Sequence, residues 1–426
     1  MALQTNAYKG ARDFYPADKR VQNYIFSVWR DVATSFGYEE YDASVIEPID
    51  LYLAKTSEEI VTEQTYVFED RGGRKVTLRP EMTPTVSRMV AGKRQELAYP
   101  LRWFSIPNLW RYERPQRGRL REHWQLNVDL FGVPEVAGDH EMILLADTIM
   151  QKFGAQRDMY NIRLNSRLLV NYVLQDKFGL DVEKSDQTVR LIDRMHKMPS
   201  DDFSSALSDI VGQASDDLMS ILRASTIDAL PIDIQQHPAA VRVHELQLLL
   251  ARAGITNAQF DISLMRGFDY YTDIVFEMFD TNPENNRSLF GGGRYDGLVG
   301  LFGVEPVPTV GFGMGDVALK DFLDVHNLLP QLGTVVDVAV LLIGEVYAGS
   351  QELIATLRAA NLRVAVDATD RKMDKKIKNA DKAGYKHVLF VGETELENNQ
   401  FALKELATGQ EQYGNIEQIK DFLLQK

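Results

Sequence analysis

Polar side chains alternate along the run REHWQLNVDLF, which occupies residues 121–131. The odd positions hold His123, Gln125, Asn127 and Asp129, and the even positions between them are apolar. In a β-strand this period of two places the polar groups on one face of a sheet. A polar face often simply meets water. Amides, an imidazole and a carboxylate, in place of lysine and glutamate, are more typical of a lined pocket.

Two neighbouring segments are expected to add groups to the same pocket. The preceding strand would bring Arg111 and Glu113 to one face, and an earlier strand would bring Arg79, Glu81 and Thr83. Each proton of an ammonium group requires an acceptor. Carboxylates and amides on adjacent strands therefore suit a zwitterionic amino acid with a polar side chain.

Arginine is concentrated in and beside the loop that joins the last two strands of this pocket. Guanidinium groups bind phosphate oxygens bidentately, so such a loop suits a triphosphate and the end of a nucleic acid. The sequence holds no GxxxxGKS or GxxxxGKT phosphate loop. ATP, if it binds, is expected on an antiparallel sheet. The arginines are Arg111, Arg114, Arg117, Arg119 and Arg121.

The elements that would position these groups are short and mainly antiparallel in the first part of the chain. Residues 19–36 have the apolar spacing of an amphipathic helix, and Gly37 is suited to end it. The other expected elements are a hairpin over 66–70 and 75–79, a helix with Thr83 as its N-cap, strands over 260–264 and 273–279, and a turn at GGGRYDG.

The chain is expected to form three parts. Residues 1–167 and 237–328 predict an α+β domain on a mixed, mainly antiparallel sheet. Residues 168–236 are polar and helix-prone, and we interpret them as an inserted helical module. Residues 331–426 alternate strand and helix, which favours an α/β domain with a largely parallel sheet.

Composition excludes several classes of protein. The 426 residues include no cysteine, which removes disulfide frameworks, thiolate metal sites and cysteine nucleophiles. Without a secretory signal or an apolar run of membrane-spanning length, the default is a soluble cytoplasmic protein with no membrane contact. The net charge of −14 argues against a protein that coats nucleic acid by bulk electrostatics. Local basic runs remain at 111–121 and 371–382, and a solvated surface is the plain alternative for each.

Several motifs together carry a family resemblance that extends from about residue 6 to the C-terminus. The run RYERPQ with Gly118-Arg119, followed by Gln125-Leu126, resembles the second signature motif of class II aminoacyl-tRNA synthetases in its histidyl form. The segments KGARDFYP, TLRPEMT, LMRGFDYYTDIVFE and GGGRYDGLV are similarly placed histidyl-type signatures. The resemblance implies activation of L-histidine by ATP to histidyl-adenylate and its transfer to tRNA(His), by a homodimer.

The resemblance also implies roles for individual residues in histidine binding. Glu81, Thr83 and Gln125 would hold the α-ammonium group. Asp129 with Tyr270 or Tyr271 would bracket the imidazole ring. The glycines that would let backbone approach the substrate are Gly291, Gly292 and Gly293.

The ATP and tRNA sites follow from the same resemblance. Arg111 would grip the α-phosphate, Glu113 the adenine or ribose, and His123 would stack on adenine. Arg266 would be the histidyl branch's own catalytic cation, acting with Arg111. Mg²⁺ is expected with ATP, and no protein metal ligands are assigned. Further ATP contacts are expected from Arg119 and Arg121, and tRNA contacts from Arg114, Gln116, Arg117, Arg371, Lys372, Lys375 and Lys376.

Taken singly, these residues have plainer readings. Tyr270-Tyr271 would be a half-buried strand pair, Gly291 to Gly293 a turn, and Arg266 a surface ion-pair partner. The chain also departs from the family pattern at two positions. Ser44 stands where the first motif usually has proline, and Ala318 stands where the third motif usually has an arginine on adenine and the γ-phosphate.

The missing arginine leaves an alternative open. A catalytically silent paralogue of this fold is the regulatory subunit of ATP phosphoribosyltransferase, a binding module and not a ligase. Such a paralogue is expected to lose the RGFDYYT segment and the C-terminal domain, and this chain has both. An RNA-sensing module of a kinase would require a kinase domain that the sequence lacks. The ligase is therefore the favoured interpretation.

Overall fold

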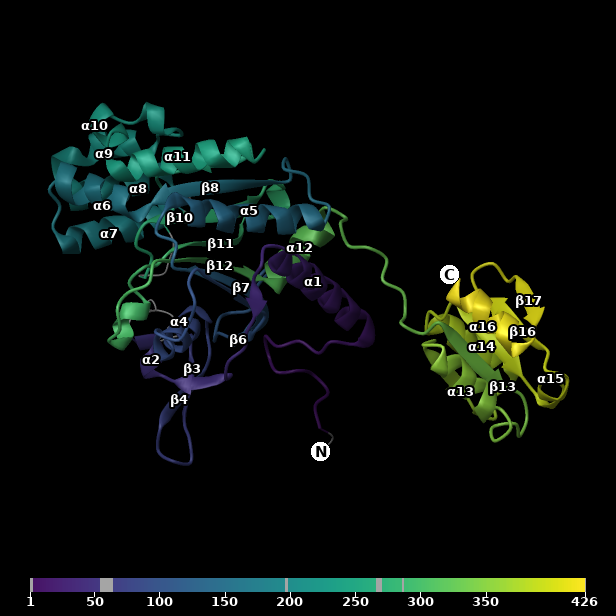
Figure 1. The fold of residues 1–426 in the computed structure, drawn as a ribbon. Helices are drawn as coiled ribbons and strands as arrows, with labels where there is room; N and C mark the ends of the chain where they lie inside the picture. Colours follow the sequence, from purple (N-terminus) through teal and green to yellow (C-terminus); the bar gives the residue numbers. More distant parts are fainter. Residues whose placement is uncertain (1–2, 54–63, 196–197, 266–269, 286, 426) are drawn as a thin grey trace. The chain divides into compact units, whose positions relative to one another are not determined.

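The computed structural model describes residues 3–53, 64–195, 198–265, 270–285 and 287–425. The chain divides into two compact units, Met1–Leu329 and Pro330–Lys426 (Figure 1). Among the described residues, no helix is both long enough and apolar enough to cross a membrane.

A nine-stranded sheet forms the centre of the first unit, in the order β1-β5-β7-β12-β11-β10-β8-β9, with β6 paired to β7. The pairs β1/β5 and β8/β9 are parallel and the others antiparallel, so the expected mixed, mainly antiparallel sheet is confirmed. Its strands are β1 (Glu39–Glu40), β5 (Leu101–Ser105), β6 (Asn108–Trp110), β7 (Glu122–Phe131), β8 (Tyr160–Ser166), β9 (Ala258–Phe260), β10 (Ile274–Asp280), β11 (Ser288–Arg294) and β12 (Thr309–Gly315).

The apolar face of β7 anchors the core of this unit. Leu126, Val128 and Leu130 are fully buried in one cluster with residues of the helices α1 (Pro16–Ser35) and α5 (Val136–Lys152). Burying one such side chain contributes about 1.5–3 kcal/mol. Because side chains alternate along a strand, the same register turns the polar residues of β7 to the other face.

Glycines in β11 correct one expectation. The segment GGGRYDG was expected to be a turn, but Gly291 to Gly293 lie inside the strand β11. A Cβ atom on Gly292 would lie 2.0 Å from the Gly311 carbonyl oxygen, and one on Gly293 would lie 2.7 Å from that of Ile274. The glycines therefore allow close packing within the sheet, which sequence alone does not distinguish from a turn.

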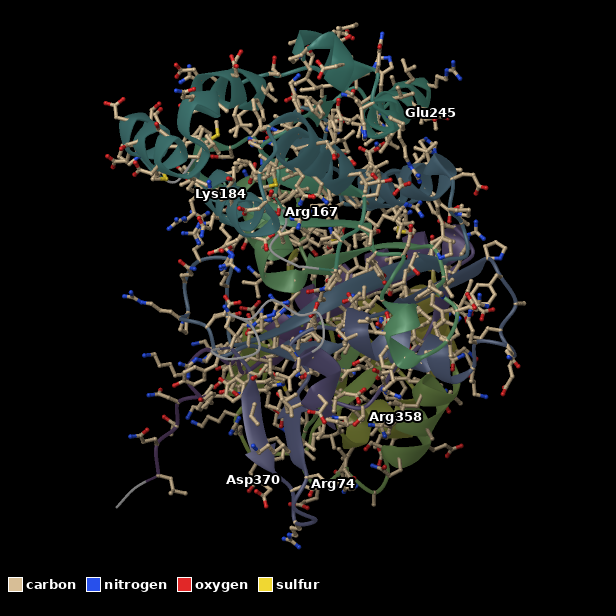
Figure 2. The ribbon with its side chains drawn as sticks, turned by 90° about the vertical axis from the view of Figure 1, so that its left-hand side faces the viewer. Arg74, Arg167, Lys184, Glu245, Arg358 and Asp370 are labelled. Carbon is tan, nitrogen blue, oxygen red and sulfur yellow. The ribbon has the colours of Figure 1, made fainter. Side chains whose placement is uncertain are left out.

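A small sheet in the order β2-β4-β3 lies beside the large one. Its hairpin carries Arg74 near the tip, where it is ion-paired with Asp70 (Figure 2). The following helix α4 has Met82 as its N-cap, so Thr83 is its first helical residue and not the cap. The elements are β2 (Ile46–Pro48), α2 (Asp50–Leu53), β3 (Tyr66–Glu69), β4 (Lys75–Leu78) and α4 (Thr83–Gly92).

Helices follow β8 and lie over one side of the large sheet (Figure 1). Their apolar faces, including Leu191, Phe203 and Leu218, join the same core as the sheet. They are α6 (Arg167–Asn171), its continuation Tyr172–Lys177, α7 (Val182–Asp193), α8 (Ser200–Val211), α9 (Ser215–Leu222), α10 (Ile232–Gln235) and α11 (Pro238–Arg252); α12 (Asp316–Val325) follows β12.

The second unit is built on a five-stranded sheet in the order β14-β13-β15-β16-β17. Its first three strands are parallel as expected, whereas β16 and β17 are antiparallel, so the sheet is mixed. A parallel crossover needs about a dozen residues or more, and the connection over 392–400 is too short for one. The elements are β13 (Val338–Leu342), α13 (Gln351–Ala359), β14 (Val364–Asp367), α14 (Met373–Lys382), β15 (His387–Val391), α15 (Glu393–Asn398), β16 (Phe401–Glu405), β17 (Glu411–Gly414) and α16 (Ile416–Leu424).

Candidate active site

A polar cavity of about 130 Å³ opens on the sheet face opposite the core. All of the residues assigned to histidine from sequence line it, except Gly292 and Gly293. Arg111, assigned to ATP, lines it as well. The complete lining is Glu81, Thr83, Arg111, Gln125, Asn127, Asp129, Tyr270, Tyr271, Gly291, Tyr295, Gly311, Phe312 and Gly313.

Glycines of β12 leave room for the polar side chains of β7. Gly311 pairs with Asp129 and Gly313 with Asn127 across the two strands. A Cβ atom on Gly313 would lie 1.9 Å from Gln125 Nε2, and one on Gly311 would lie 2.7 Å from Asp129 Oδ1. Sequence reasoning missed these two glycines, although their period-two spacing in VGFGMG was a usable signal.

The carboxyl group of Asp129 lines the cavity and is buried. It is 1% exposed and accepts a hydrogen bond from the Tyr295 hydroxyl. Burial raises its pKa to about 7, although hydrogen bonds from Tyr295 and Tyr41 act in the opposite direction. Tyr295 belongs to the GGGRYDG motif but was not assigned a role from sequence, because nothing in that motif indicates which face it takes.

A second carboxyl group, that of Glu81, faces the cavity from another segment. Glu81 is 2% exposed, and the Tyr270 hydroxyl donates to its Oε2 at 3.2 Å. On the neighbouring strand, Gln125 Nε2 donates to Asn127 Oδ1 at 2.9 Å. The cavity therefore presents two carboxyl groups and two amides, which are acceptors for both an ammonium group and a ring N–H.

Cations lie beside these acceptors at the start of the arginine loop. Arg111 Nε donates to the Pro80 carbonyl oxygen at 2.9 Å. Its Nη1 lies 3.9 Å from Glu113 Oε1, and Arg119 Nη1 lies 3.7 Å from Glu113 Oε2. Glu113 therefore holds two guanidinium groups near each other, an arrangement suited to adjacent phosphates.

Arg121, expected to contact ATP, makes contacts within the protein. Its side chain is buried, and its guanidinium lies 3.9 Å from the centre of the Tyr112 ring. Its Nε donates to the Glu113 carbonyl oxygen at 3.1 Å and its Nη1 to the Tyr8 hydroxyl at 3.2 Å. These contacts use the guanidinium to brace the loop, and sequence could not predict them because the N-terminal segment is distant along the chain.

His123 lies on β7 beyond the cavity lining. Burial, with the positive charges of Arg111 and Arg12, lowers the pKa of His123 to about 3, so the ring is neutral at physiological pH. Arg12 was not considered from sequence. Its Nη2 lies 2.8 Å from Asp316 Oδ2, at the start of α12 and two residues before Ala318.

The residues assigned to tRNA have different positions. Arg114, Gln116 and Arg117 are exposed in the arginine loop. In the second unit Arg371, Lys372 and Lys375 are exposed as well. Lys376 is a correction: its side chain is buried and its Nζ donates to the carbonyl oxygens of Leu342 at 2.6 Å and Asp367 at 3.3 Å. The expected catalytic cation Arg266 lies outside the described residues.

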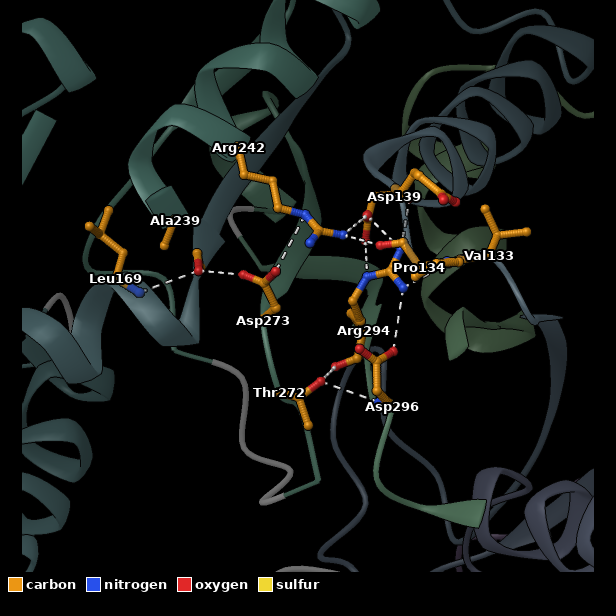
Figure 3. Close-up of polar contacts among 12 residues, drawn as sticks. Val133, Pro134, Asp139, Leu169, Ala239, Arg242, Thr272, Asp273, Arg294 and Asp296 are labelled. Atoms are coloured by element: carbon orange, nitrogen blue, oxygen red, sulfur yellow. Dashed lines mark hydrogen bonds and ion pairs between the residues drawn. The ribbon is translucent and has the colours of Figure 1, made fainter. Parts of the chain in front are cut away.

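A buried ionic network supports the segments that hold the cavity's tyrosines (Figure 3). Arg294, which precedes Tyr295, is 1% exposed and pairs with Asp139 at 2.7 Å. Arg242 of α11 lies 3.5 Å from Asp139 and 3.4 Å from Asp273. Asp273, two residues after Tyr271, also accepts from the Ser166 hydroxyl at 2.6 Å. The network therefore ties α5, α11, β8 and β11 together behind the site.

Metal-binding side chains are not clustered in the part of the chain that the structure describes: no group of three or more histidine, aspartate or glutamate residues is arranged to hold an ion.

The fold is that of class II histidyl-tRNA synthetases of known structure. The enzyme from Nostoc superposes with a TM-score of 0.83 at 19% identity and covers 100% of both chains. The apo enzyme from S. aureus has a TM-score of 0.75 at 23% identity over 99% of this chain and 100% of its own. At these identities the likeness concerns the fold alone.

Sequence comparison identifies the family. A family model described as histidyl-tRNA synthetase matches residues 10–318, and one described as anticodon binding domain matches residues 337–426. Histidine–tRNA ligase of Leptospira biflexa is 43% identical over 95% of this chain and 94% of its own, and that of Thermoplasma volcanium is 35% identical over 99% of each. The chain belongs to the histidyl-tRNA synthetase family.

Proposed function

We propose that this cavity is the site where the chain performs the family's reaction, the ATP-dependent ligation of histidine to its tRNA. The observation that carries the assignment is the joint presence of Glu81, Gln125, Asp129 and Tyr270 around one small polar cavity. Acceptors from three separate segments of the chain suit a ligand with an ammonium group and a ring N–H. The family match and the relatives' names support the same reaction.

Histidine would lie with its α-ammonium group near Glu81, Thr83 and Gln125 and its imidazole near Asp129. A ring N–H in a closed pocket requires an acceptor, because an unpaired one costs roughly 1–3 kcal/mol. Tyr270 and Tyr271 would close the cavity over the ring. An amino acid with an apolar side chain would leave Asp129 unpaired, which supplies selectivity against it.

ATP would extend from the cavity along the arginine loop. Arg111 joins the cavity lining to Glu113 and Arg119, so it is suited to the α-phosphate at which the histidine carboxylate attacks. The neutral ring of His123 is suited to stack on adenine. Mg²⁺ bound with the nucleotide would supply positive charge that offsets the charge of the outer phosphates. Arg266 remains the proposed catalytic cation from the family resemblance alone.

A replacement for the arginine absent at Ala318 is also proposed. Ala318 lies in the helix α12. The ion pair with Asp316 holds the Arg12 side chain at the start of this helix, and the positive charge of Arg12 contributes to the lowered pKa of His123. We infer that Arg12, with Arg119 and Mg²⁺, neutralises the outer phosphates. Arg121 is left out of this set because its guanidinium braces the loop.

Transfer to tRNA would use the exposed basic residues. Arg114, Gln116 and Arg117 would meet the acceptor end, and Arg371, Lys372 and Lys375 would contact the anticodon arm. The match of residues 337–426 to an anticodon-binding domain supports the second assignment. The helical module over 168–236 is proposed as an insertion that packs on the core of the first unit, without an assigned role.

A homodimer is proposed from the small three-stranded sheet. The strand register puts Ile46 and Phe68 on one face, and these apolar side chains are 46% and 42% exposed. Covering such a face by a second copy would remove it from water. Sedimentation velocity of the Phe68→Asp variant should show a shift towards monomer, and an unchanged sedimentation coefficient would contradict this interface.

The regulatory paralogue is not favoured. One solved structure described as an ATP phosphoribosyltransferase regulatory subunit/histidyl-tRNA synthetase, from Bacillus halodurans, has a TM-score of 0.75, but at 22% identity it shares the fold alone. Histidine-dependent exchange of pyrophosphate into ATP distinguishes the two functions. The ligase should catalyse this exchange with magnesium, and Glu81→Gln should reduce it. A pure, folded protein without any exchange would refute the proposal.

A further inference from the structure

Two buried hydroxyl groups lie near the carboxyl group of Asp129. Three buried polar atoms are grouped here: Asp129 Oδ2, the Tyr41 hydroxyl and Ser105 Oγ. None of them has a well-formed hydrogen bond within the described part of the chain. Asp129 and Ser105 are 1% and 0% exposed, so water outside the protein does not satisfy them. Three unsatisfied polar atoms in one place are uncommon in a folded protein and indicate a function.

Two strands of the sheet, β5 and β7, and the residue that follows β1 bring these atoms together. Trp103 of β5 pairs with Asp129, and Ser105 pairs with Asn127, so Ser105 faces the same side as the cavity lining. The backbone N–H of Tyr41 donates to the Phe104 carbonyl oxygen at 2.8 Å, which extends the pairing of β1 with β5. The Tyr41 ring packs on Trp103 with centroids 5.5 Å apart. Tyr41 therefore reaches Asp129 across Trp103.

A different hydroxyl group serves the other oxygen of Asp129. Tyr295 already donates to the other oxygen, Oδ1, which is the one beside Gly311. Tyr41 lies close enough to Asp129 to oppose the rise in the pKa of its carboxyl group, and burial together with the negative charge of Asp129 raises the pKa of Tyr41. The other charged side chains that act on Tyr41 are Arg79 and Asp42.

We propose that Tyr41 is a positioning residue for histidine recognition: its hydroxyl, with that of Ser105, holds the second oxygen of Asp129 from behind the cavity. The two hydroxyl groups contact this oxygen directly or through one internal water, since all three atoms are polar and enclosed. It orients the carboxylate so that its free lone pairs face the imidazole N–H. It also stabilises the ionised form, which is the form that accepts from the ring. This inference rests on the proposed contact between Asp129 and histidine.

The physical reason for such a support is the depth of Asp129. Burial favours the neutral carboxylic acid, and its pKa is already raised to about 7 with the present donors. A neutral acid has a proton on one oxygen and is a poorer acceptor for an imidazole N–H. Loss of one donor should raise the pKa further and allow the side chain to rotate.

The test compares Tyr41→Phe with Tyr99→Phe by pyrophosphate exchange from pH 6 to pH 9. Tyr99 is a matched control, because its hydroxyl is also buried without a partner in the described residues, and its ring packs in the same cluster as Tyr41. Tyr41→Phe should raise the KM for histidine on the order of tenfold, the scale of one hydrogen bond to a charged group, with kcat and the KM for ATP nearly unchanged.

The pH profile separates positioning from mere destabilisation. The KM for histidine should begin to rise on acidification about one unit higher in pH for Tyr41→Phe than for the unmodified protein. The same profile for Tyr99→Phe should overlay the unmodified one. Ser105→Ala should move the profile in the same direction as Tyr41→Phe.

Two outcomes would overturn separate claims. If Asp129→Asn raises the KM for histidine but Tyr41→Phe leaves both the KM and its pH profile unchanged, the positioning role is wrong and the proposed site survives. If Asp129→Asn itself leaves the histidine KM unchanged, the assignment of the cavity to histidine is wrong. Equal losses in Tyr41→Phe and Tyr99→Phe would also refute the positioning role, because both would then report general destabilisation.

Discussion

Replacing Asp129 with asparagine should stabilise the folded protein while it weakens histidine binding. The pKa of Asp129 is raised from 3.8 to about 7 in the fold. A carboxyl group whose pKa is raised by folding favours the folded state only below its unfolded pKa. That advantage is lost as the pH rises through the folded pKa, so at pH 8 the charge of Asp129 destabilises the fold.

The magnitude follows from the two pKa values. At 1.36 kcal/mol per pKa unit, the penalty at pH 8 is about 4 kcal/mol, and at pH 5 it is less than half as large. The amide introduced by Asp129→Asn would carry no charge and could still accept from Tyr295. The stability advantage of this variant should therefore grow by about 2–3 kcal/mol between pH 5 and pH 8.

Denaturant unfolding of the first unit at several pH values measures this difference. The matched control is Asp70→Asn, because the hydrogen bonds and ion pair with Arg74 lower the pKa of the exposed Asp70. The change in the free energy of unfolding of Asp70→Asn should have the opposite sign. Any loss of stability should be present at neutral pH and should fade as the pH falls. If the gain in the free energy of unfolding of Asp129→Asn does not vary with pH, the reasoning is refuted. Replacing a buried group that ionises with one that stays neutral must make this gain depend on pH.

Three further predictions test other parts of the molecule. Lys375→Ala should raise the tRNA KM in aminoacylation and reduce its salt dependence, because Lys375 is exposed. Lys376→Met should instead lower the melting temperature of the second unit and leave the tRNA KM of the folded protein unchanged, because Lys376 is buried. Arg12→Met should raise the ATP KM in pyrophosphate exchange with little change in the histidine KM; equal changes in both would argue against a phosphate role. Asp139→Asn should reduce the free energy of unfolding by about 3–5 kcal/mol, because it removes the buried carboxylate that pairs with Arg294 and leaves only the partly exposed Asp296, 3.4 Å away; a loss below about 1 kcal/mol in denaturant titration would contradict that account.

Local patterns were sufficient for the elements whose cause is local. The period-two alternation of β7 predicted both faces of the central strand, because side chains of a strand alternate whatever surrounds it. The apolar spacing before Gly37 predicted α1, and that glycine has the positive φ of 80° that a helix end favours. The motif resemblance named the family that the comparisons identify.

Local patterns failed where the cause lies in another strand. Gly291 to Gly293 were expected in a turn, but they lie in the strand β11, where the Gly311 and Ile274 carbonyl oxygens leave no room for a Cβ atom on Gly292 and Gly293. Lys376 was grouped with its exposed neighbours in a basic run, but the helix α14 turns it inward to the carbonyl oxygens of Leu342 and Asp367. The sequence around Lys376 does not indicate that these two carbonyl oxygens are its partners.

The sequence by itself determined which strand carries the polar face, which loop carries the cations and which family the chain joins, because periodicity and motif order are properties of neighbouring residues. Only the tertiary structure decided that Tyr295 and Tyr41 meet Asp129 and that Arg12 reaches Asp316, a contact across 304 positions of the chain. Burial and charge act between atoms that are close in space, so the pKa of Asp129 and the use of each arginine follow from strand order and packing. The pairing of the strands determines the partners of these side chains, and their positions in the sequence do not.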